Sequence, residues 1–166
     1  MKHYEDGRET PGFLLWQVSK LWQRHLAIAL KELNLSNTQF VILGNIVRLA
    51  REQRMVTQIM VSAATKVDPM STSHVISVLE KKKLVTRIDH PEDKRAYYVQ
   101  PTEEGINLSE QALKKVIETH EIFFQPLEEN TEMLVTLLMK LIDKNDIPYT
   151  TVNKRKAIAI KETQAK

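Results

Sequence analysis

The stretch of residues 57–100 constrains the fold most, because two helix-start signals are followed there by two strand signals. Thr57 is expected to cap a short helix that ends near Thr65. Asp68 and Pro69 predict the start of a second helix, since an acidic cap followed by proline at the first helical position is a favoured beginning. Two short helices joined by a tight turn form a helix-turn-helix.

A β-hairpin is predicted directly after this pair of helices. The second helix is expected to continue to about Lys82. Leu84–Asp89 and Ala96–Gln100 are rich in residues that favour strands, and they bracket the polar sequence HPEDKR. The order of a helix-turn-helix followed by a hairpin defines a winged helix, in which the hairpin is the wing.

Helices are predicted on both sides of this unit. From Gly12 to Leu33 apolar residues recur at helical spacing, in a stripe wide enough to need two packing partners. Asn34 can end this helix in the left-handed conformation. Ser36 and Gln39 form a capping box for the next helix, which runs through about Ala50.

Two further helices are predicted after the hairpin. Thr102 is expected to cap a long helix, and Pro126 interrupts it. A last helix is expected over residues 129–144, followed by a basic tail at 148–166. The predicted fold class is therefore mainly α with a small β-hairpin wing: a winged helix-turn-helix at residues 36–100 with helical regions at 1–35 and 101–147.

Composition narrows the classes of function. The 166-residue chain has no cysteine, which excludes disulfides, thiol catalysis and cysteine-ligated zinc. It has no apolar segment of membrane-spanning length, so we expect a soluble, cytoplasmic protein with no membrane association. The net charge of +3 is unevenly spread, because an acidic segment at residues 101–147 separates basic ones. Such a pattern suits a protein that presents one face to a polyanion, although ordinary solvated helix faces explain it equally well.

Enzymatic chemistry has little support. The chain has no nucleophile elbow and no glycine-rich phosphate loop, and its five histidines form no i, i+4 pair for a metal. A site built from His25 or His120 with Glu118 or Glu121 is the remaining arrangement, and surface histidines are the more common alternative. We therefore predict no enzyme, no cofactor and no bound metal.

The second helix of the helix-turn-helix is the candidate recognition helix. Helical spacing places four residues inward: Thr72, Val75, Ile76 and Leu79. Five residues then face outward: Ser71, Ser73, His74, Ser77 and Lys81. Hydroxyl and imidazole groups can bond base edges or phosphates. A merely solvated helix face is the alternative for this set.

The basic residues of the wing region add a second signal. Phosphate-directed charge would come from the run Lys81, Lys82 and Lys83 with Arg87, Lys94 and Arg95. Asp93 and Arg95 point to the same side of an extended strand, so the carboxylate can support the guanidinium. An arginine held in this way suits a narrow minor groove. The alternatives are a solvated helix end and a weak surface ion pair.

These features together resemble the MarR family of bacterial transcriptional regulators. The resemblance rests on DKRAYYVQPTEEG, SNTQFVIL and TSHVISVLEKKKLVTR, and covers about residues 12–145. It implies a homodimer in which the N-terminal helix and the two C-terminal helices of each subunit interlock. It also implies that the two winged helices bind double-stranded DNA at a pseudo-palindromic operator.

The chain departs from the family pattern at four places. Lys83 stands where the family usually has glycine, so we expect a strained left-handed lysine there. Pro101 replaces a leucine and removes one ladder donor. His74 often corresponds to arginine, so base readout should be softer, and residues 60–62 differ from the usual Glu-Leu-Ala.

Family members often bind small aromatic or phenolic effectors between the dimerisation helices and the winged helix. By resemblance, four residues are candidates to line such a pocket: Trp16, Trp22, His25 and Phe40. Core packing is the alternative for each. We interpret the sequence as a homodimeric, sequence-specific DNA-binding regulator, with repressor favoured over activator. The alternatives are a winged-helix protein-interaction module without DNA binding and a metal-responsive sensor.

Overall fold

A computed structural model describes residues 10–52, 55–89 and 97–146. The chain divides into two compact units, Met1–Gln125 and Pro126–Lys166, which are treated separately. In the described residues no helix is both long enough and apolar enough to cross a membrane.

The first helix ends as its sequence predicts. Helix α1 (Pro11–Leu30) has proline in its first turn and continues into a short 3-10 turn, η2 (Lys31–Leu33). Asn34 follows in the left-handed conformation, with φ of 53°, which confirms its role as the terminator. Of the apolar stripe of α1, only Leu26 and Leu30 are buried, and Leu30 belongs to the core of the first unit. Helix α1 packs against both α5 and α2.

Helix α2 (Asn37–Glu52) supplies the centre of the core. The predicted capping box is present, because the Gln39 amide donates to Ser36 Oγ at 3.2 Å and the Ser36 amide donates to Gln39 Oε1 at 3.3 Å. Five of its apolar residues are buried: Ile42, Leu43, Ile46, Val47 and Leu49.

The helix-turn-helix forms where the two caps were predicted. Thr57 caps α3 (Gln58–Thr65) by accepting a hydrogen bond at 3.3 Å from the amide three residues on. Asp68 caps α4 (Pro69–Lys81) in the same way at 2.9 Å. Both expectations are therefore confirmed by cap geometry.

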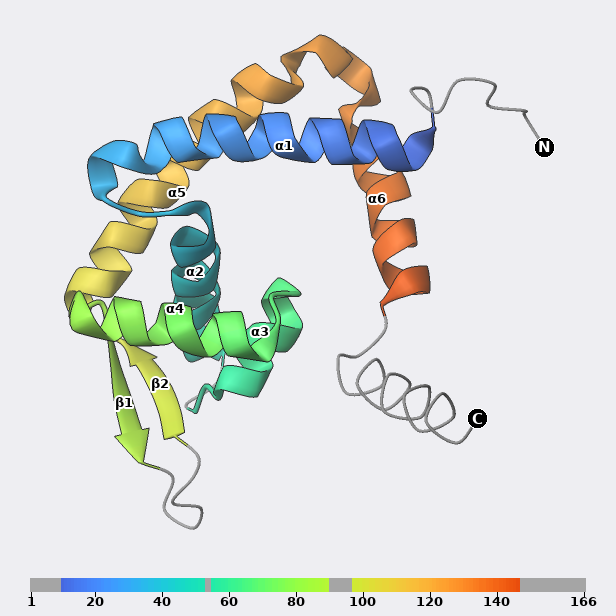
Figure 1. Cartoon of the computed structure of the whole chain (residues 1–166). Coiled ribbons are helices and arrows are strands. Elements are labelled where there is room, and N and C mark those ends of the chain that lie inside the picture. The colour runs from blue at the N-terminus through green and yellow to red at the C-terminus, as the bar shows by residue number, and fades with distance from the viewer. Residues whose placement is uncertain (1–9, 53–54, 90–96, 147–166) are drawn as a thin grey trace, which may run out of the picture. The chain divides into compact units, whose positions relative to one another are not determined.

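The predicted hairpin is also present. Strands β1 (Val85–Asp89) and β2 (Tyr97–Pro101) pair antiparallel, each beginning one residue later than expected. Pro101 lies opposite Val85 at the end of the ladder, where a missing donor interrupts no further pair. Figure 1 shows the hairpin at the C-terminal end of α4, leading into α5.

Helix α5 (Glu103–Phe124) is capped by Thr102, whose hydroxyl accepts from the Gly105 amide at 3.0 Å. In the second unit, η3 (Gln125–Asn130) leads into α6 (Thr131–Asn145), which has no buried residue.

The core of the first unit lies where α2, α3, α4 and the hairpin meet. Its largest fully buried side chains include Leu30, Ile42, Leu43, Ile46, Val56, Val61, Ile76, Leu79, Val85 and Val99. This packing holds α4 with one face inward and the other free.

Candidate nucleic-acid interface

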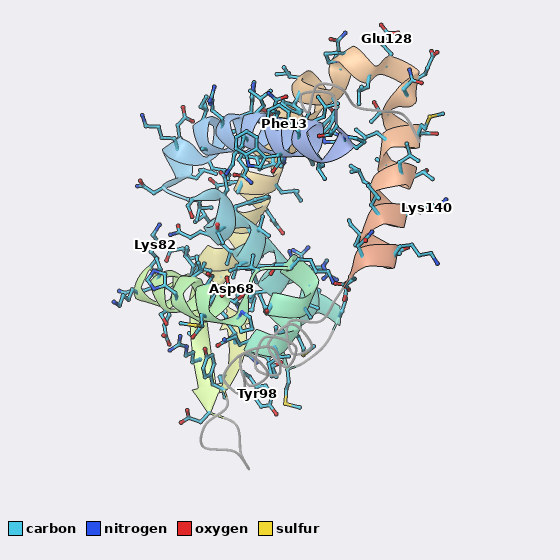
Figure 2. All side chains as sticks on the ribbon, turned by 45° about the vertical axis from the view of Figure 1, so that its right-hand side comes forward. Phe13, Asp68, Lys82, Tyr98, Glu128 and Lys140 are labelled. Carbon is cyan, nitrogen blue, oxygen red and sulfur yellow. The ribbon has the colours of Figure 1, made fainter. Side chains whose placement is uncertain are left out.

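Helix α4 presents a polar face to solvent. Thr72, Ile76 and Leu79 are fully buried, and Val75 is half-buried, so the predicted inward face is confirmed. Of the outward set, three residues are exposed: Ser71, His74 and Lys81. Ser73 and Ser77 are half-buried. Figure 2 labels Asp68 and Lys82 at the two ends of this helix.

The start of α4 is stabilised by the charge of its cap. The hydroxyl and the amide of Ser71 both bond the Asp68 carboxylate and hold its pKa below the usual range. The cap is therefore ionised at neutral pH, where it satisfies backbone donors of the first turn.

Ser77 and Arg87 contact each other. Arg87 Nη2 donates to Ser77 Oγ at 2.6 Å, and Arg87 Nη1 lies 3.4 Å from Glu80 Oε2. The Ser77 hydroxyl in turn donates to the Ser73 carbonyl at 3.0 Å. The sequence predicts that Ser77 and Arg87 both face DNA. In the structure they bond each other and so connect β1 to α4.

Tyr97 extends this connection to α3. Its ring centroid lies 4.4 Å below the Arg87 guanidinium, and its hydroxyl donates to Gln58 Oε1 at 2.6 Å. Gln58 Nε2 donates to the Pro69 carbonyl at 2.8 Å. Sequence reasoning missed Gln58, Glu80 and Tyr97, because their partners are far apart along the chain and only packing brings them together.

The three lysines at the end of α4, Lys81 to Lys83, have different surroundings. Lys82 Nζ donates to the Asn34 carbonyl at 2.5 Å and to Gln39 Oε1 at 3.0 Å, so it ties the end of α4 to the start of α2. Lys83 is exposed and left-handed, with φ of 60°, as expected from the glycine that usually stands at this position in the family that the sequence resembles. Lys81 is exposed on the polar face of α4.

The tip of the wing lies outside the described residues. This includes Asp93, Lys94 and Arg95, so the predicted pairing of Asp93 with Arg95 stays a prediction. The described strands end at Asp89 and begin again at Tyr97.

A cavity of about 490 Å³ opens between α2 and α5. Its lining is mostly apolar and includes Phe40, Val47 and Leu113. Two ion pairs border it: Arg51 Nη2 with Glu110 Oε1 at 2.7 Å, and Arg48 Nη1 with Glu52 Oε1 at 2.9 Å.

The four candidate effector residues do not converge on this cavity. Phe40 lines it, whereas Trp22 packs on Phe123 with ring centroids 5.2 Å apart, and His25 packs on the same ring at 5.3 Å. Trp16 is 57% exposed and stacks on Phe13. The structure therefore separates Phe40 from the other three.

The histidines named as metal candidates contact rings. His120 lies 4.7 Å from Phe124 and 6.3 Å from Trp22, measured between ring centroids. Within the described part of the chain, no three histidine, aspartate or glutamate side chains gather as a metal-binding group.

Comparison with known sequences places the chain among bacterial regulators. A family model described as "MarR family" matches residues 33–96. YdcH of Bacillus subtilis (strain 168), an uncharacterized HTH-type transcriptional regulator, is 36% identical over 115 residues, which cover 69% of this chain and 78% of that protein.

Solved structures of MarR-type regulators are also similar to this chain. A mutant of MarR from E. coli complexed with operator DNA is 26% identical, with a TM-score of 0.69, covering 79% of this chain and 91% of that one. CouR from Rhodococcus jostii RHA1 bound to p-coumaroyl-CoA is also 26% identical, with a TM-score of 0.67 and coverage of 85% and 94%.

Proposed function

The chain belongs to the MarR family of transcriptional regulators, and we propose that it acts as a homodimeric repressor at a pseudo-palindromic operator. Members of this family bind DNA and are regulators rather than enzymes. The observation that carries the proposal is the exposed polar face of α4 directly beside a paired hairpin. In winged helices these two elements enter the major groove and follow the DNA backbone or minor groove.

Roles can be proposed for the candidate residues on this basis. Ser71, Ser73 and His74 would contact base edges, with Ser73 limited by its half-burial. Phosphate contacts are proposed for Lys81 and Lys94, and minor-groove contact for Arg95 with Asp93 as its support. Ser77 and Arg87 would act at the same interface while holding the wing against α4.

Dimerisation is supported by apolar surface that the described protomer leaves uncovered. On α1 and α5 this surface includes Leu14, Leu15, Val18, Leu21, Leu113 and Ile117, each 45–52% exposed. The wide stripe on α1 needs two partners, and α5 of the same chain provides one. A second copy of the chain would provide the other, with residues 1–35 and 101–147 as the dimerisation region and 36–100 as the DNA-binding domain.

We also propose that a small aromatic ligand relieves repression from the cavity between α2 and α5. Its volume suits such a molecule, and Phe40 and Leu113 provide apolar contact. Because α2 carries the core of the winged helix and α5 belongs to the proposed dimerisation region, a ligand between them could change the spacing of the two recognition helices.

The proposal is tested by DNA binding as a function of salt. A binding site is first selected from a random-sequence library, and its affinity is measured between about 50 and 200 mM salt. If six or more phosphates are contacted, the affinity should fall by about a thousandfold or more over that range. A winged helix that serves only as a protein adaptor would show no such binding.

Two variants separate the proposed roles. Arg95→Ala should weaken binding by about 1–3 kcal/mol while leaving the dimer intact. Unchanged affinity would remove the wing from the mechanism. Ser73→Ala should instead reduce the difference between selected and random DNA, and an equal loss on both would assign that residue to phosphate.

A further inference from the structure

Met70 is an apolar side chain in an unexpected place. Most large apolar side chains that are exposed in the described residues lie on α1, α5 and α6. In the winged helix four are exposed: Met55, Ile59, Met70 and Ile88. Met70 is 85% exposed, the highest value of all. Dimerisation through α1 and α5 leaves this exposure unexplained.

The position of Met70 is that of a base-reading residue. It is the second residue of α4, at the end marked by Asp68 in Figure 2. Helical spacing puts it on one stripe with His74, Ser77 and Lys81. In helix-turn-helix proteins the N-terminal residues of the recognition helix contact base edges.

The surroundings of Met70 leave room for a partner. A hollow of about 510 Å³ lies between the start of α2 and the outer side of α4. Met70, Ser71 and His74 line its α4 side together with Val75 and Val78, while Ser36, Thr38 and Gln39 line the other. Because Val75 and Val78 are half-buried, the exposed residues beside Met70 in this hollow carry hydrogen-bonding groups, followed along the stripe by the charge of Lys81. Such a surface suits a polyanion with one apolar feature better than an apolar protein partner.

Thymine provides that apolar feature. Its C5-methyl group lies at the edge of the major groove, among donors and acceptors that serine and histidine can bond. A methionine side chain is unbranched and flexible, so it can adapt to a methyl group without exact positioning. Burying both groups together removes apolar surface from water.

We propose that Met70 packs against the C5-methyl group of one thymine in each operator half-site and thereby determines part of the operator sequence. This inference rests on the proposed function, because it requires α4 to lie in the major groove. It assigns sequence discrimination to a residue that makes no hydrogen bond with a base.

The test removes the methyl group alone. In the selected binding site each thymine is replaced in turn by deoxyuridine, which keeps every hydrogen bond to adenine. For the wild-type chain, one substitution per half-site should lower affinity about fourfold, the factor for one buried methyl-sized group. Met70→Ala should bind the thymine and deoxyuridine sites equally, and Met70→Leu should keep part of the preference.

Ile59→Ala is the matched control, because Ile59 is 78% exposed on α3, the helix that does not enter the groove. This variant should keep the wild-type preference for thymine. The inference is overturned if the wild-type chain is indifferent to every substitution, or if Met70→Ala keeps the preference. In both cases DNA binding itself persists, so the proposed function stands. If no DNA is bound with salt dependence, the proposed function fails and this inference fails with it.

Discussion

At the scale of single residues, the backbone is closely packed where α4, β1 and α5 meet. Thr102 Oγ1 donates to the Lys83 carbonyl at 2.8 Å, and the Thr102 amide donates to the Leu84 carbonyl at 3.1 Å. A Cβ added to Gly105 would lie 2.0 Å from that same Leu84 oxygen. The start of α5 therefore packs directly on the backbone that leads into the wing.

Lys83→Gly should stabilise the protein. The left-handed conformation costs a residue with a Cβ about 1–2 kcal/mol, and the extra freedom of glycine in the unfolded chain returns part of that. The free energy of unfolding should therefore rise by about 0.5–1 kcal/mol. Urea denaturation at a fixed protein concentration measures this change. Lys81→Gly, at the last residue of α4, is the control and should lower stability by up to about 1 kcal/mol; if both variants lose stability, the lysine at position 83 is not strained.

Gly105→Ala should have the opposite effect. The added methyl group meets backbone rather than a movable side chain, so the free energy of unfolding should fall by about 1–3 kcal/mol. Gly44→Ala is the matched control within α2, where the nearest atom to an added Cβ is Ser109 Oγ at 3.8 Å. That variant should be neutral or gain up to about 1 kcal/mol from helix propensity. Equal effects of the two substitutions in urea denaturation would contradict the close contact at Gly105.

At the scale of secondary-structure elements, Arg87 joins the wing to the recognition helix. It bonds Ser77 on α4 and lies over Tyr97 on β2, which in turn bonds Gln58 on α3. The four elements α3, α4, β1 and β2 thus share one polar network at the base of the wing. The Arg87 side chain is only 29% exposed, which limits its approach to phosphate.

A double-mutant cycle measures this connection. Ser77→Ala and Arg87→Ala, alone and combined, should show a coupling of about 1.5–3 kcal/mol in the free energy of unfolding, as expected for a hydrogen bond to a charged group. The same cycle with Ser71→Ala should show no coupling, because Ser71 bonds Asp68 instead. Additive effects of Ser77→Ala and Arg87→Ala would show that the contact does not contribute to stability.

At the scale of the whole molecule, the proposed homodimer depends on the exposed apolar side chains of α1. Leu15 is 52% exposed in the described protomer, so a charge at this position should leave the fold of the first unit intact. In a dimer that buries this face, the same charge would be desolvated without a partner.

Leu15→Glu should therefore weaken the dimer at least tenfold, corresponding to about 1.4 kcal/mol. Sedimentation over a range of protein concentrations measures the dissociation constant, and circular dichroism checks that the helices persist. Ile59→Glu is the control, since Ile59 is exposed on α3 and should leave the dimer unchanged. A wild-type monomer, or a Leu15→Glu dimer of unchanged affinity, would contradict dimerisation through α1.

The sequence alone predicts those features of the structure that depend on contacts between residues close together in the chain. The starts of α2, α3, α4 and α5 were predicted because each cap bonds an amide only three residues on, as Ser36 and Thr102 do. The left-handed Asn34 was predicted for the same reason, because conformation at a helix end depends on immediate neighbours. The left-handed Lys83 followed instead from the family resemblance, in which glycine usually stands at that position. Of the candidate site, the exposed residues Ser71, His74 and Lys81 followed from helical spacing.

Only the tertiary structure decided which polar groups remain free for a ligand. Lys82 is turned back to Asn34, 48 residues away, and Ser77 is occupied by Arg87. Phe40 was separated from the other aromatic candidates by the packing of α2 against α5. The helix caps depend on interactions within one helical turn, so they can be predicted from the sequence pattern alone. The partners of Arg87, Lys82 and Phe40 depend on how separate elements pack, so no pattern along the chain contains them.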